Sequence, residues 1–252
     1  MPPELRALFA SQHRVATSGQ IHAILSRGAF QRHLRRGDIV KVWPNVYADH
    51  RPDDLIRLRG LDLRCGEPVA ICLHTAARLY GFSTEDVAGL HVLNPAARRL
   101  RDQTGLIVHR REGIPLTVYR GRPLTPPAWT AVEVARSLPR PRALATLDAA
   151  LRSATCTTDD LLAAAALQAG RRNVAMVRLL VPLARPGAES PMESEARLVM
   201  IDGGLPEPVL QYELVDRDGR CWRVDFAWPE HGVVAEYDGF DFHSSPADLR
   251  RD

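Results

Sequence analysis

Lysine is almost absent from this sequence, because Lys41 is the single lysine among 33 basic residues in a chain of 252. Arginine supplies the remaining positive charge, and its planar guanidinium binds phosphate and guanine better than an ammonium group does. An arginine- and alanine-rich composition is equally typical of GC-rich coding DNA. The composition alone therefore leaves nucleic-acid binding and coding bias as open alternatives.

Long apolar runs are also missing, since none approaches the roughly 18 residues that a transmembrane helix needs. The N-terminal stretch "MPPELRALFASQHR" has no apolar signal core, which predicts a cytoplasmic protein with no membrane partner. The four cysteines are widely spaced and form no C-x-x-C pair, which disfavours zinc knuckles and a disulfide framework. The hydrophobic fraction of 45% is ordinary for a globular protein and disfavours disorder.

Charge is divided unevenly along the chain. Residues 1–185 contain 27 Lys and Arg against 15 Asp and Glu, a net charge of +12. Residues 186–252 contain 6 against 15, a net charge of −9. A basic segment suits a polyanion such as DNA, whereas an acidic segment suits a metal ion or a basic partner.

Residues 1–52 have the pattern of three short helices followed by a hairpin. "ELRALFASQ" has helical apolar spacing, and "ATSGQIHAILS" offers Thr17 or Ser18 as an N-cap. "RGAFQRHLRRGD" predicts a basic helix that ends at Gly37, and "IVKVWPNVYA" predicts two strands joined by a turn. This order predicts a winged helix-turn-helix domain.

A basic helix of this kind can enter the major groove while the hairpin touches phosphate. We therefore predict that this domain binds double-stranded DNA. The predicted contact residues are Arg27, Arg32, Arg35, Arg36 and Lys41. The alternative is a solvated basic helix face with no partner.

Residues 53–185 predict an α/β middle module. Strands are expected in "LHVLNP" and "GLIVHRR", one strand and a helix in "PLTVYRGRPLTPPAWTAVEVARSL", and helices near 141–153 and 158–169. His74, His91 and His109 could contact phosphate or take part in catalysis, but isolated histidines near strand ends are more often structural. "RPGAESP" at 185–191 has the composition of a linker.

Residues 186–252 predict a helix followed by a three-stranded antiparallel meander. Ser190 is the expected N-cap, and Glu193 has the spacing of a capping box. The strands are expected in "VLQYEL", "CWRVDFAW" and "GVVAEY". Asp225 and Glu236 then lie on neighbouring strands, where their carboxylates could converge on one ion.

Such a pair of carboxylates suits Mg²⁺, which takes one or two protein carboxylates together with water and phosphate oxygens. A divalent ion activates water and neutralises charge on a scissile phosphodiester. Asp225 and Glu236 are the expected metal ligands, Glu193 could supply a third acid, and His243 could act as general base. The alternatives are a purely capping role for Glu193 and a salt bridge from Asp225 to Arg223 or Arg197.

The segment "SPMES…VDFAWPEHGVVAEYDGFDFH" resembles the Vsr-like branch of the PD-(D/E)XK nuclease superfamily. The resemblance implies an α-β-β-β-α-β core and Mg²⁺-dependent DNA cleavage. It implies catalytic roles for five residues and matches Gly239 to the glycine that follows. The five are Glu193, Asp225, Glu236, Asp238 and His243. Asp238 stands where the general superfamily pattern has lysine.

The stretch "VATSGQIHAILSRGAFQRHLRRGDIVKVWPNVYA" resembles the winged helix-turn-helix of AbiEi-type antitoxins, and "HTAARLYGF" resembles the segment after it. This second resemblance implies a cognate toxin protein as a partner. Together the patterns predict an α+β chain with an N-terminal winged helix-turn-helix, an α/β middle module and a C-terminal restriction-endonuclease-like domain. The function expected first is a Mg²⁺-dependent endonuclease, and the alternative is an antitoxin or repressor whose nuclease-like part is inactive or an interaction surface.

The C-terminal core is expected to be incomplete, because only a few residues follow the start of a helix near Pro246. A sheet without its closing strand exposes an edge and apolar side chains. We expect Trp222, Val233 and Val234 to be uncovered, residues 186–252 to be the least stable part, and nuclease activity to be weak or absent.

Overall fold

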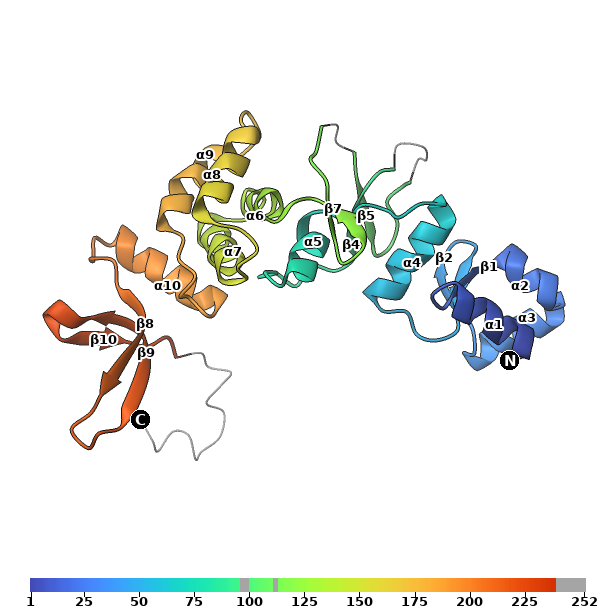
Figure 1. Cartoon of the computed structure of the whole chain (residues 1–252), viewed down its shortest axis with the longest axis horizontal. Coiled ribbons are helices and arrows are strands. Elements are labelled where there is room, and N and C mark those ends of the chain that lie inside the picture. Colours follow the sequence, from blue (N-terminus) through green and yellow to red (C-terminus); the bar gives the residue numbers. More distant parts are fainter. Residues whose placement is uncertain (96–99, 111–112, 239–252) are drawn as a thin grey trace. The chain divides into compact units, whose positions relative to one another are not determined.

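The computed structural model describes residues 1–95, 100–110 and 113–238. The chain divides into two compact units, residues 1–76 with 87–126 and residues 77–86 with 127–252 (Figure 1). The domain boundaries expected near residues 52 and 185 both fall inside these units. Both units contain helices and strands, in agreement with the α+β class.

The first unit begins with three helices and a small antiparallel sheet. The elements are α1 (Pro3–Ser11), β1 (Val15–Thr17), α2 (Ser18–Ile24), α3 (Arg27–Arg36), β2 (Val40–Trp43) and β3 (Val46–Ala48). The strand order is β1-β3-β2. The sequence pattern predicted the helices and the hairpin, but it did not predict β1.

Local capping signals explain where these helices begin and end. Thr17 caps α2, and Gln20 completes a capping box in which each side chain accepts the other residue's backbone N–H. Ser26 caps α3 by accepting the backbone N–H of Ala29. Gly37 ends α3 with φ 76°, a left-handed conformation that glycine adopts without strain.

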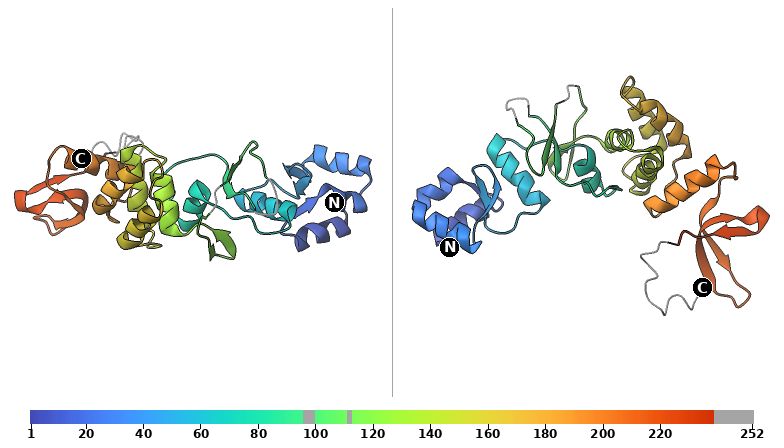
Figure 2. Two further views of the ribbon diagram at one scale, coloured as in Figure 1. Left: turned by 90° about the horizontal axis from the view of Figure 1, so that it is seen from above. Right: turned by 180° about the vertical axis from the view of Figure 1, so that it is seen from behind.

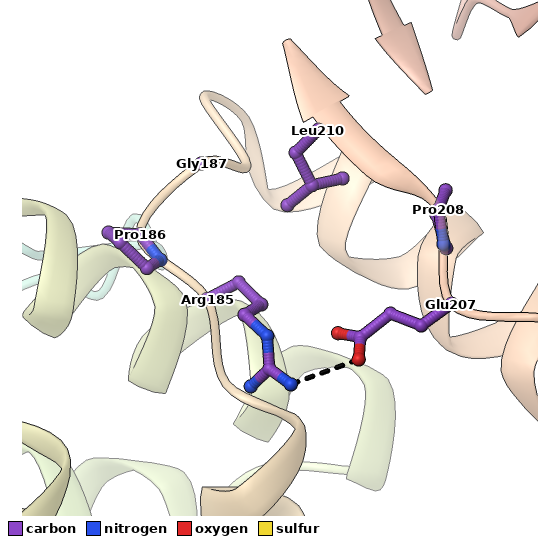
Figure 3. A pocket seen from close by; sticks show the side chains of 6 residues that line it. All are labelled: Arg185, Pro186, Gly187, Glu207, Pro208 and Leu210. Carbon is purple, nitrogen blue, oxygen red and sulfur yellow. Dashed lines mark hydrogen bonds and ion pairs between the residues drawn. The ribbon is translucent and has the colours of Figure 1, made fainter. Parts of the chain in front are cut away.

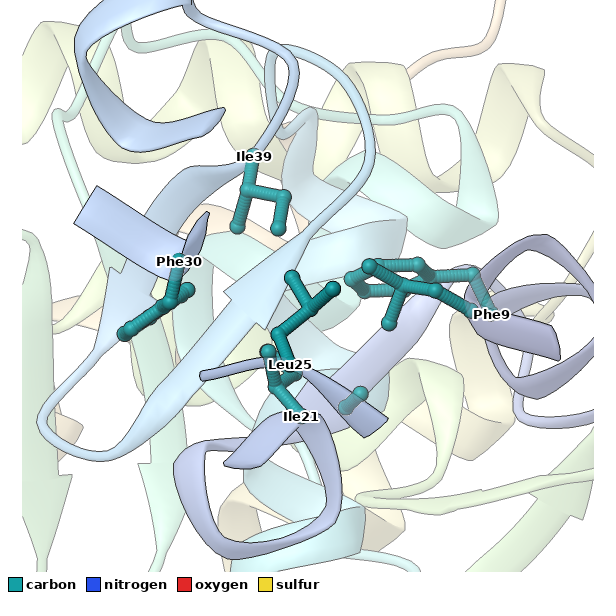
Figure 4. Close-up of a cluster of buried hydrophobic side chains, with 7 residues drawn as sticks. Phe9, Ile21, Leu25, Phe30 and Ile39 are labelled. Atoms are coloured by element: carbon teal, nitrogen blue, oxygen red, sulfur yellow. The ribbon is translucent and has the colours of Figure 1, made fainter. Parts of the chain in front are cut away.

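A shared apolar core joins the three helices to the sheet (Figure 4). A fully buried Leu, Ile or Phe side chain contributes about 1.5–3 kcal/mol to stability, because folding removes it from water. Phe30 on the inner face of α3 is 3% exposed and makes an edge-on contact with Tyr47 of β3. The opposite face of α3 is therefore directed to solvent. The core residues are Leu5, Phe9, Ala16, Ile21, Leu25, Phe30 and Ile39.

Helix α4 (Asp54–Cys65) packs against this sheet. The indole Nε1 of Trp43 donates a hydrogen bond of 2.7 Å to the carbonyl of Arg57. A side chain at Gly60 would meet Trp43 at 3.0 Å, so glycine permits the close approach of helix and sheet.

A second, larger group of strands completes this unit. Parallel β4 (Leu90–Leu93) and β5 (Leu106–His109) form one pair, and antiparallel β6 (Thr117–Tyr119) and β7 (Arg122–Leu124) form another. Ile71 bridges to both Val92 and Leu124. The sequence pattern predicted one strand where β6 and β7 form a hairpin. This expectation was wrong, because Arg120 and Gly121 both adopt positive φ and reverse the chain.

The second unit is mainly helical at its start. Helix α5 (Leu73–Tyr80) leads into it, and helices follow in the order α6 (Pro127–Ala135), α7 (Arg140–Arg152), α8 (Thr158–Leu167), α9 (Val174–Leu180), η1 (Val181–Leu183) and α10 (Pro191–Asp202). Helices α8 and α9 lie next to one another (Figure 2). The sequence pattern did not predict α9. Its N-cap Asn173 is left-handed and makes no side-chain capping hydrogen bond, so α9 begins without the usual capping contact.

The meander at the end of the chain has the predicted order. Strand β9 (Cys221–Trp228) pairs antiparallel with β8 (Val209–Val215) on one side and with β10 (Val233–Ala235) on the other. A short helix η2 (Pro229–His231) forms the second turn. As expected, Trp222, Val233 and Val234 are about half exposed.

The segment between α9 and α10 is held against β8 rather than lying free as a linker. Ala188 is fully buried, and Arg185 forms an ion pair of 2.9 Å with Glu207 (Figure 3). A side chain at Gly187 would lie 2.9 Å from Leu210, so glycine is required for this approach. Within the described residues, no helix is both long enough and apolar enough to cross a membrane.

Candidate functional site

The basic residues predicted to contact DNA form one exposed group, which we call the α3 basic surface. It consists of Arg27, Arg32, Arg35, Arg36 and Lys41, all of which are exposed. Within the part of the chain that the structure describes, none of these five forms an ion pair with a carboxylate. Their charges are therefore available to an anionic partner.

The packing of α3 fixes the direction of these side chains. Phe30 and Leu34 pack against the core, and on a helix of 3.6 residues per turn this directs Arg32, Arg35 and Arg36 to the opposite side. Arg32 and Arg36 are four residues apart and lie one above the other. Three guanidinium groups thus share one solvent-facing arc of a short helix.

The end of α3 is tied to the strand that follows it. His33 Nδ1 lies 2.8 Å from Asp38 Oδ2, and this hydrogen bond is the main reason that the pKa of Asp38 is lowered. The contact holds the last turn of α3 against the start of β2. The basic helix and the hairpin that carries Lys41 are thereby positioned together.

A second candidate site lies where α10 meets the C-terminal sheet. Gln211 Nε2 donates to Glu193 Oε2 at 3.1 Å and to Asp225 Oδ1 at 3.2 Å. The backbone N–H of Tyr237 donates to Asp225 Oδ2 at 2.9 Å. Two of the predicted acids are thus brought together from α10 and β9, with a single amide between their carboxylates.

Gln211 was not predicted, although it connects this site. It lies on β8 with φ 50°, and the ladder pairs with β9 on either side of it but not at Gln211 itself. A left-handed residue inside a strand marks a local irregularity of the type often found near functional sites. The sequence "VLQYEL" contains no glycine or proline that would have indicated it.

The remaining predicted site residues are Glu236, Asp238, Gly239 and His243. Glu236 follows Ala235, which pairs with Phe226, so continuing the register sets Glu236 opposite Asp225. The side chain of Glu236 is exposed, as is that of Asp238. Gly239 and His243 lie outside the described residues. Among residues that are described, no three His, Cys, Asp or Glu side chains gather closely enough to hold a metal ion.

The ion-pair partners of Arg223 and Arg197 show whether either arginine binds Asp225. Arg223 pairs with Glu189 through two contacts of 2.9 Å, and Arg197 pairs with Asp148. Among the described residues, the alternative salt bridge from Asp225 to Arg223 or Arg197 is therefore not formed. Glu193 is 8% exposed, and its backbone N–H is capped by Ser190.

Only half of the predicted capping box at α10 is formed. The Glu193 carboxylate accepts the backbone N–H of Glu189 at 2.8 Å instead of that of Ser190. The same carboxylate also binds Gln211, so Glu193 has both a structural contact and a place in the site.

The three histidines of the middle region are not isolated, contrary to the expectation from sequence. His91 Nδ1 lies 3.1 Å from His109 Nε2, and the rings of His74 and His91 are 5.2 Å apart. His91 and His109 come from the paired strands β4 and β5, while His74 comes from α5. The pairing of strands β4 and β5, which the sequence does not specify, brings them together.

Comparison with known proteins identifies the family. The chain is 51% identical over 228 residues to two proteins of Mycobacterium tuberculosis, uncharacterized protein MT2308 of strain CDC 1551 / Oshkosh and uncharacterized protein Rv2248 of strain ATCC 25618 / H37Rv. The match covers 90% of this chain and 84% of each relative. The chain belongs to one family with them.

Residues 69–183 of the chain match the family described as the AbiEi antitoxin C-terminal domain. The matched region runs from the strand region before α5 to η1. The AbiEi-type resemblance of the middle region is therefore confirmed.

Proposed function

We propose that this chain is a DNA-binding regulator of the AbiEi antitoxin type, and that residues 1–52 form its winged helix-turn-helix domain. The observation that carries the proposal is the α3 basic surface, whose five exposed cations have no carboxylate partner among the described residues. The antitoxin match at residues 69–183 supports the same class of function.

In this proposal α3 lies in the major groove, and Arg32, Arg35 and Arg36 contact phosphates or guanine edges. Lys41 at the start of the β2–β3 hairpin contacts the sugar-phosphate backbone as the wing. Burial of Phe30 in the core holds α3 rigid, which reduces the entropy lost when its side chains bind. A cognate toxin protein is the second proposed partner.

The direct test is binding of the full chain to fragments of its host genome in a gel-shift assay. The variant with both Arg32→Ala and Arg35→Ala should lose most of its affinity for duplex DNA, because two of the phosphate or base contacts are removed. Arg64→Ala is the matched control. Arg64 is an exposed arginine of α4, so it removes the same type of charge from another helix.

The control removes one positive charge and the double variant removes two. A loss of binding free energy in the control of about half that in the double variant would therefore show that only net charge matters. Unchanged affinity in the double variant would remove α3 from the interface. Either result would contradict the proposed winged helix-turn-helix mode.

A second candidate function is metal-dependent hydrolysis of a phosphodiester bond at the C-terminal sheet. The observation that favours it is the convergence of Glu193 and Asp225 on Gln211. Because each accepting oxygen lies about 3 Å from one amide nitrogen, one hydrated ion could bind both groups. The all-oxygen donor set suits Mg²⁺.

In this candidate function Asp225 and Glu236 hold the ion, which would supply Lewis acidity and a more acidic bound water. Glu193 would orient that water or bind the ion directly. Gln211 fixes the separation of the Glu193 and Asp225 carboxylates, and the N–H of Tyr237 keeps the Asp225 carboxylate from rotating. His243 stays a predicted general base.

The test of this site is the melting temperature of the full chain with and without Mg²⁺ or Mn²⁺. An ion that binds only the folded state raises the melting temperature by mass action. Asp225→Asn should abolish this increase, whereas Glu213→Gln, an exposed acid of β8, should retain it. A melting temperature in the unmutated protein that does not respond to either ion would contradict the metal site.

A further inference from the structure

Gln31 differs from the other exposed residues of α3, because its side chain is polar but uncharged. The remaining exposed residues of this helix are arginines and one glycine. The side-chain hydrogen bonds of α3 and its cap are made by Ser26 and His33. Among the described residues, the Gln31 amide has no hydrogen-bond partner. The amide therefore does not stabilise the fold through a hydrogen bond.

Gln31 belongs to a group of exposed residues on the outer side of α3, which we call the α3 outer stripe. The group has the spacing i, i+3, i+4 and i+7, which places its members on one side of an α-helix. It consists of Gly28, Gln31, Arg32 and Arg35. At 100° per residue these positions lie about 100–160° around the helix from Phe30, which is buried in the core. A recognition helix in the major groove would present this stripe to the base edges.

Gly28 leaves the α3 outer stripe without a side chain near the start of the helix. Its φ is not positive, so the backbone conformation does not require glycine. A Cβ at this position would meet only the end of the Arg32 side chain, at 3.9 Å, so packing does not require glycine either. Glycine in a helix is less stable than alanine. Close approach of the helix backbone to a partner is a physical reason for glycine at such a position.

The glutamine amide matches the edge of adenine in the major groove. Its NH₂ group donates to N7 of adenine, while its carbonyl oxygen accepts from the N6 amino group. The amide carries no charge, so a contact with phosphate would release no counterion, and arginine is the better phosphate ligand. A neutral amide among arginines is therefore better suited to read a base than to bind the backbone.

We propose that Gln31 reads the adenine of an A·T pair in the major groove, and that Gly28 lets the start of α3 approach the bases closely. This inference rests on the proposed DNA-binding function and adds sequence specificity to it. Arg32 and Arg35 on the same stripe contact phosphate or guanine and hold the helix in position. The expected target is a duplex with one A·T pair that the chain contacts directly.

Selection of duplexes from a random-sequence library by the full chain tests the proposal, when affinities are then measured for the selected duplex and its single-base-pair variants. At one position the unmutated chain should prefer A·T over G·C by about 5- to 150-fold, the discrimination of a bidentate contact. Gln31→Ala should lose this preference and keep those at other positions. Its salt dependence and its affinity for an unrelated duplex should be unchanged, because no charge is removed.

Gln31→Arg gives a stricter test, because arginine binds guanine through O6 and N7. This variant should change the preference at the same base pair from A·T to G·C. A variant that had only lost stability could not show such an exchange.

Gly28→Ala tests the close approach of α3. It should weaken binding to the selected duplex, because the added methyl group lies between the helix and the bases. Gly19→Ala is the matched control, since Gly19 is also exposed and is the second residue of α2, as Gly28 is of α3. Neither variant should lower the melting temperature, because alanine favours a helix more than glycine does.

The outcomes separate this inference from the proposed function. Binding of duplex DNA without any sequence preference, or identical base preferences in the unmutated chain and Gln31→Ala, would overturn the role of Gln31 and leave DNA binding in place. Failure of the unmutated chain to bind any duplex would overturn the DNA-binding function and this inference together. Equal weakening by Gly28→Ala and Gly19→Ala would overturn the role of Gly28.

Discussion

Arg197 is the largest fully buried side chain among the described residues. Its guanidinium lies 2.7 Å from Asp148 Oδ2 and donates to the carbonyl of Leu183 at 2.7 Å. Asp148 is also fully buried and accepts the backbone N–H of Arg185 at its second oxygen. These contacts join α10 to α7 and hold the start of the segment that leads to the C-terminal sheet.

Removing one member of this pair should cost far more than removing both. Arg197→Met leaves Asp148 buried without its counter-charge, and breaking a buried pair in this way costs about 3–5 kcal/mol. The double variant Asp148→Leu with Arg197→Met should recover much of that loss. The free energy of unfolding from urea denaturation, followed in all three proteins, measures both effects. A loss below about 1 kcal/mol in the single variant would mean that the pair is not structurally important.

Cys156 provides a prediction about alkaline pH. Burial raises the pKa of its thiol to about 11, so the folded state keeps the proton after the unfolded state has lost it. Its contribution to stability is therefore present below the unfolded thiol pKa of about 9 and is lost as pH rises toward 11. Comparing urea midpoints between these pH values should show a smaller decline in Cys156→Ala than in the unmutated protein. Identical declines would show that the thiol is not the titrating group.

Single residues of the candidate site show the limits of sequence reasoning. The acids Glu193 and Asp225 were recognised because carboxylates at a helix start and in a strand form a known pattern. Gln211 was not recognised, because its place in the site depends on a left-handed backbone conformation. The neighbouring residues contain no sequence signal for that conformation. The contact between His91 and His109 was missed for a related reason, since it depends on which strands pair.

At the scale of elements, local chemistry predicted most boundaries. Thr17 with Gln20, Ser26, Gly37 and Ser190 each start or end a helix through contacts within a few residues. The failures occurred at α9, whose N-cap Asn173 makes no side-chain capping hydrogen bond, and in the β6–β7 turn, where a positive φ falls on Arg120. Pairing between distant strands, as in β4 with β5, depends on tertiary packing and was not predictable.

At the scale of the whole molecule, ion pairs explain part of the uneven distribution of charge along the chain. Acids of the C-terminal region pair with arginines that precede them: Asp202 with Arg140, Glu195 with Arg142, and Glu207 with Arg185. These pairs join the acidic segment to the helices before it, although each exposed pair adds only about 0–1 kcal/mol. Much of the positive charge of residues 127–185 is therefore neutralised within the second unit.

The α3 basic surface differs from those arginines because its charges stay uncompensated. This contrast supports the proposal that the N-terminal region binds a polyanion, since charge without an internal partner is available for phosphate. It also explains why overall composition was a poor guide, because exposed arginines without an ion-pair partner and arginines that pair internally count equally in a sequence.

The salt dependence of DNA binding shows directly whether the α3 basic surface contacts phosphate. For a protein that neutralises phosphates, the logarithm of affinity falls linearly with the logarithm of salt concentration, by about 0.9 for each phosphate contact. Arg32→Ala and Arg35→Ala should each weaken binding to duplex DNA, and each lost phosphate contact should reduce the slope by about one unit. Arg64→Ala should leave the slope as it is. If the α3 variants and Arg64→Ala have the same affinity and slope as the unmutated chain, α3 does not contact DNA and the account is wrong.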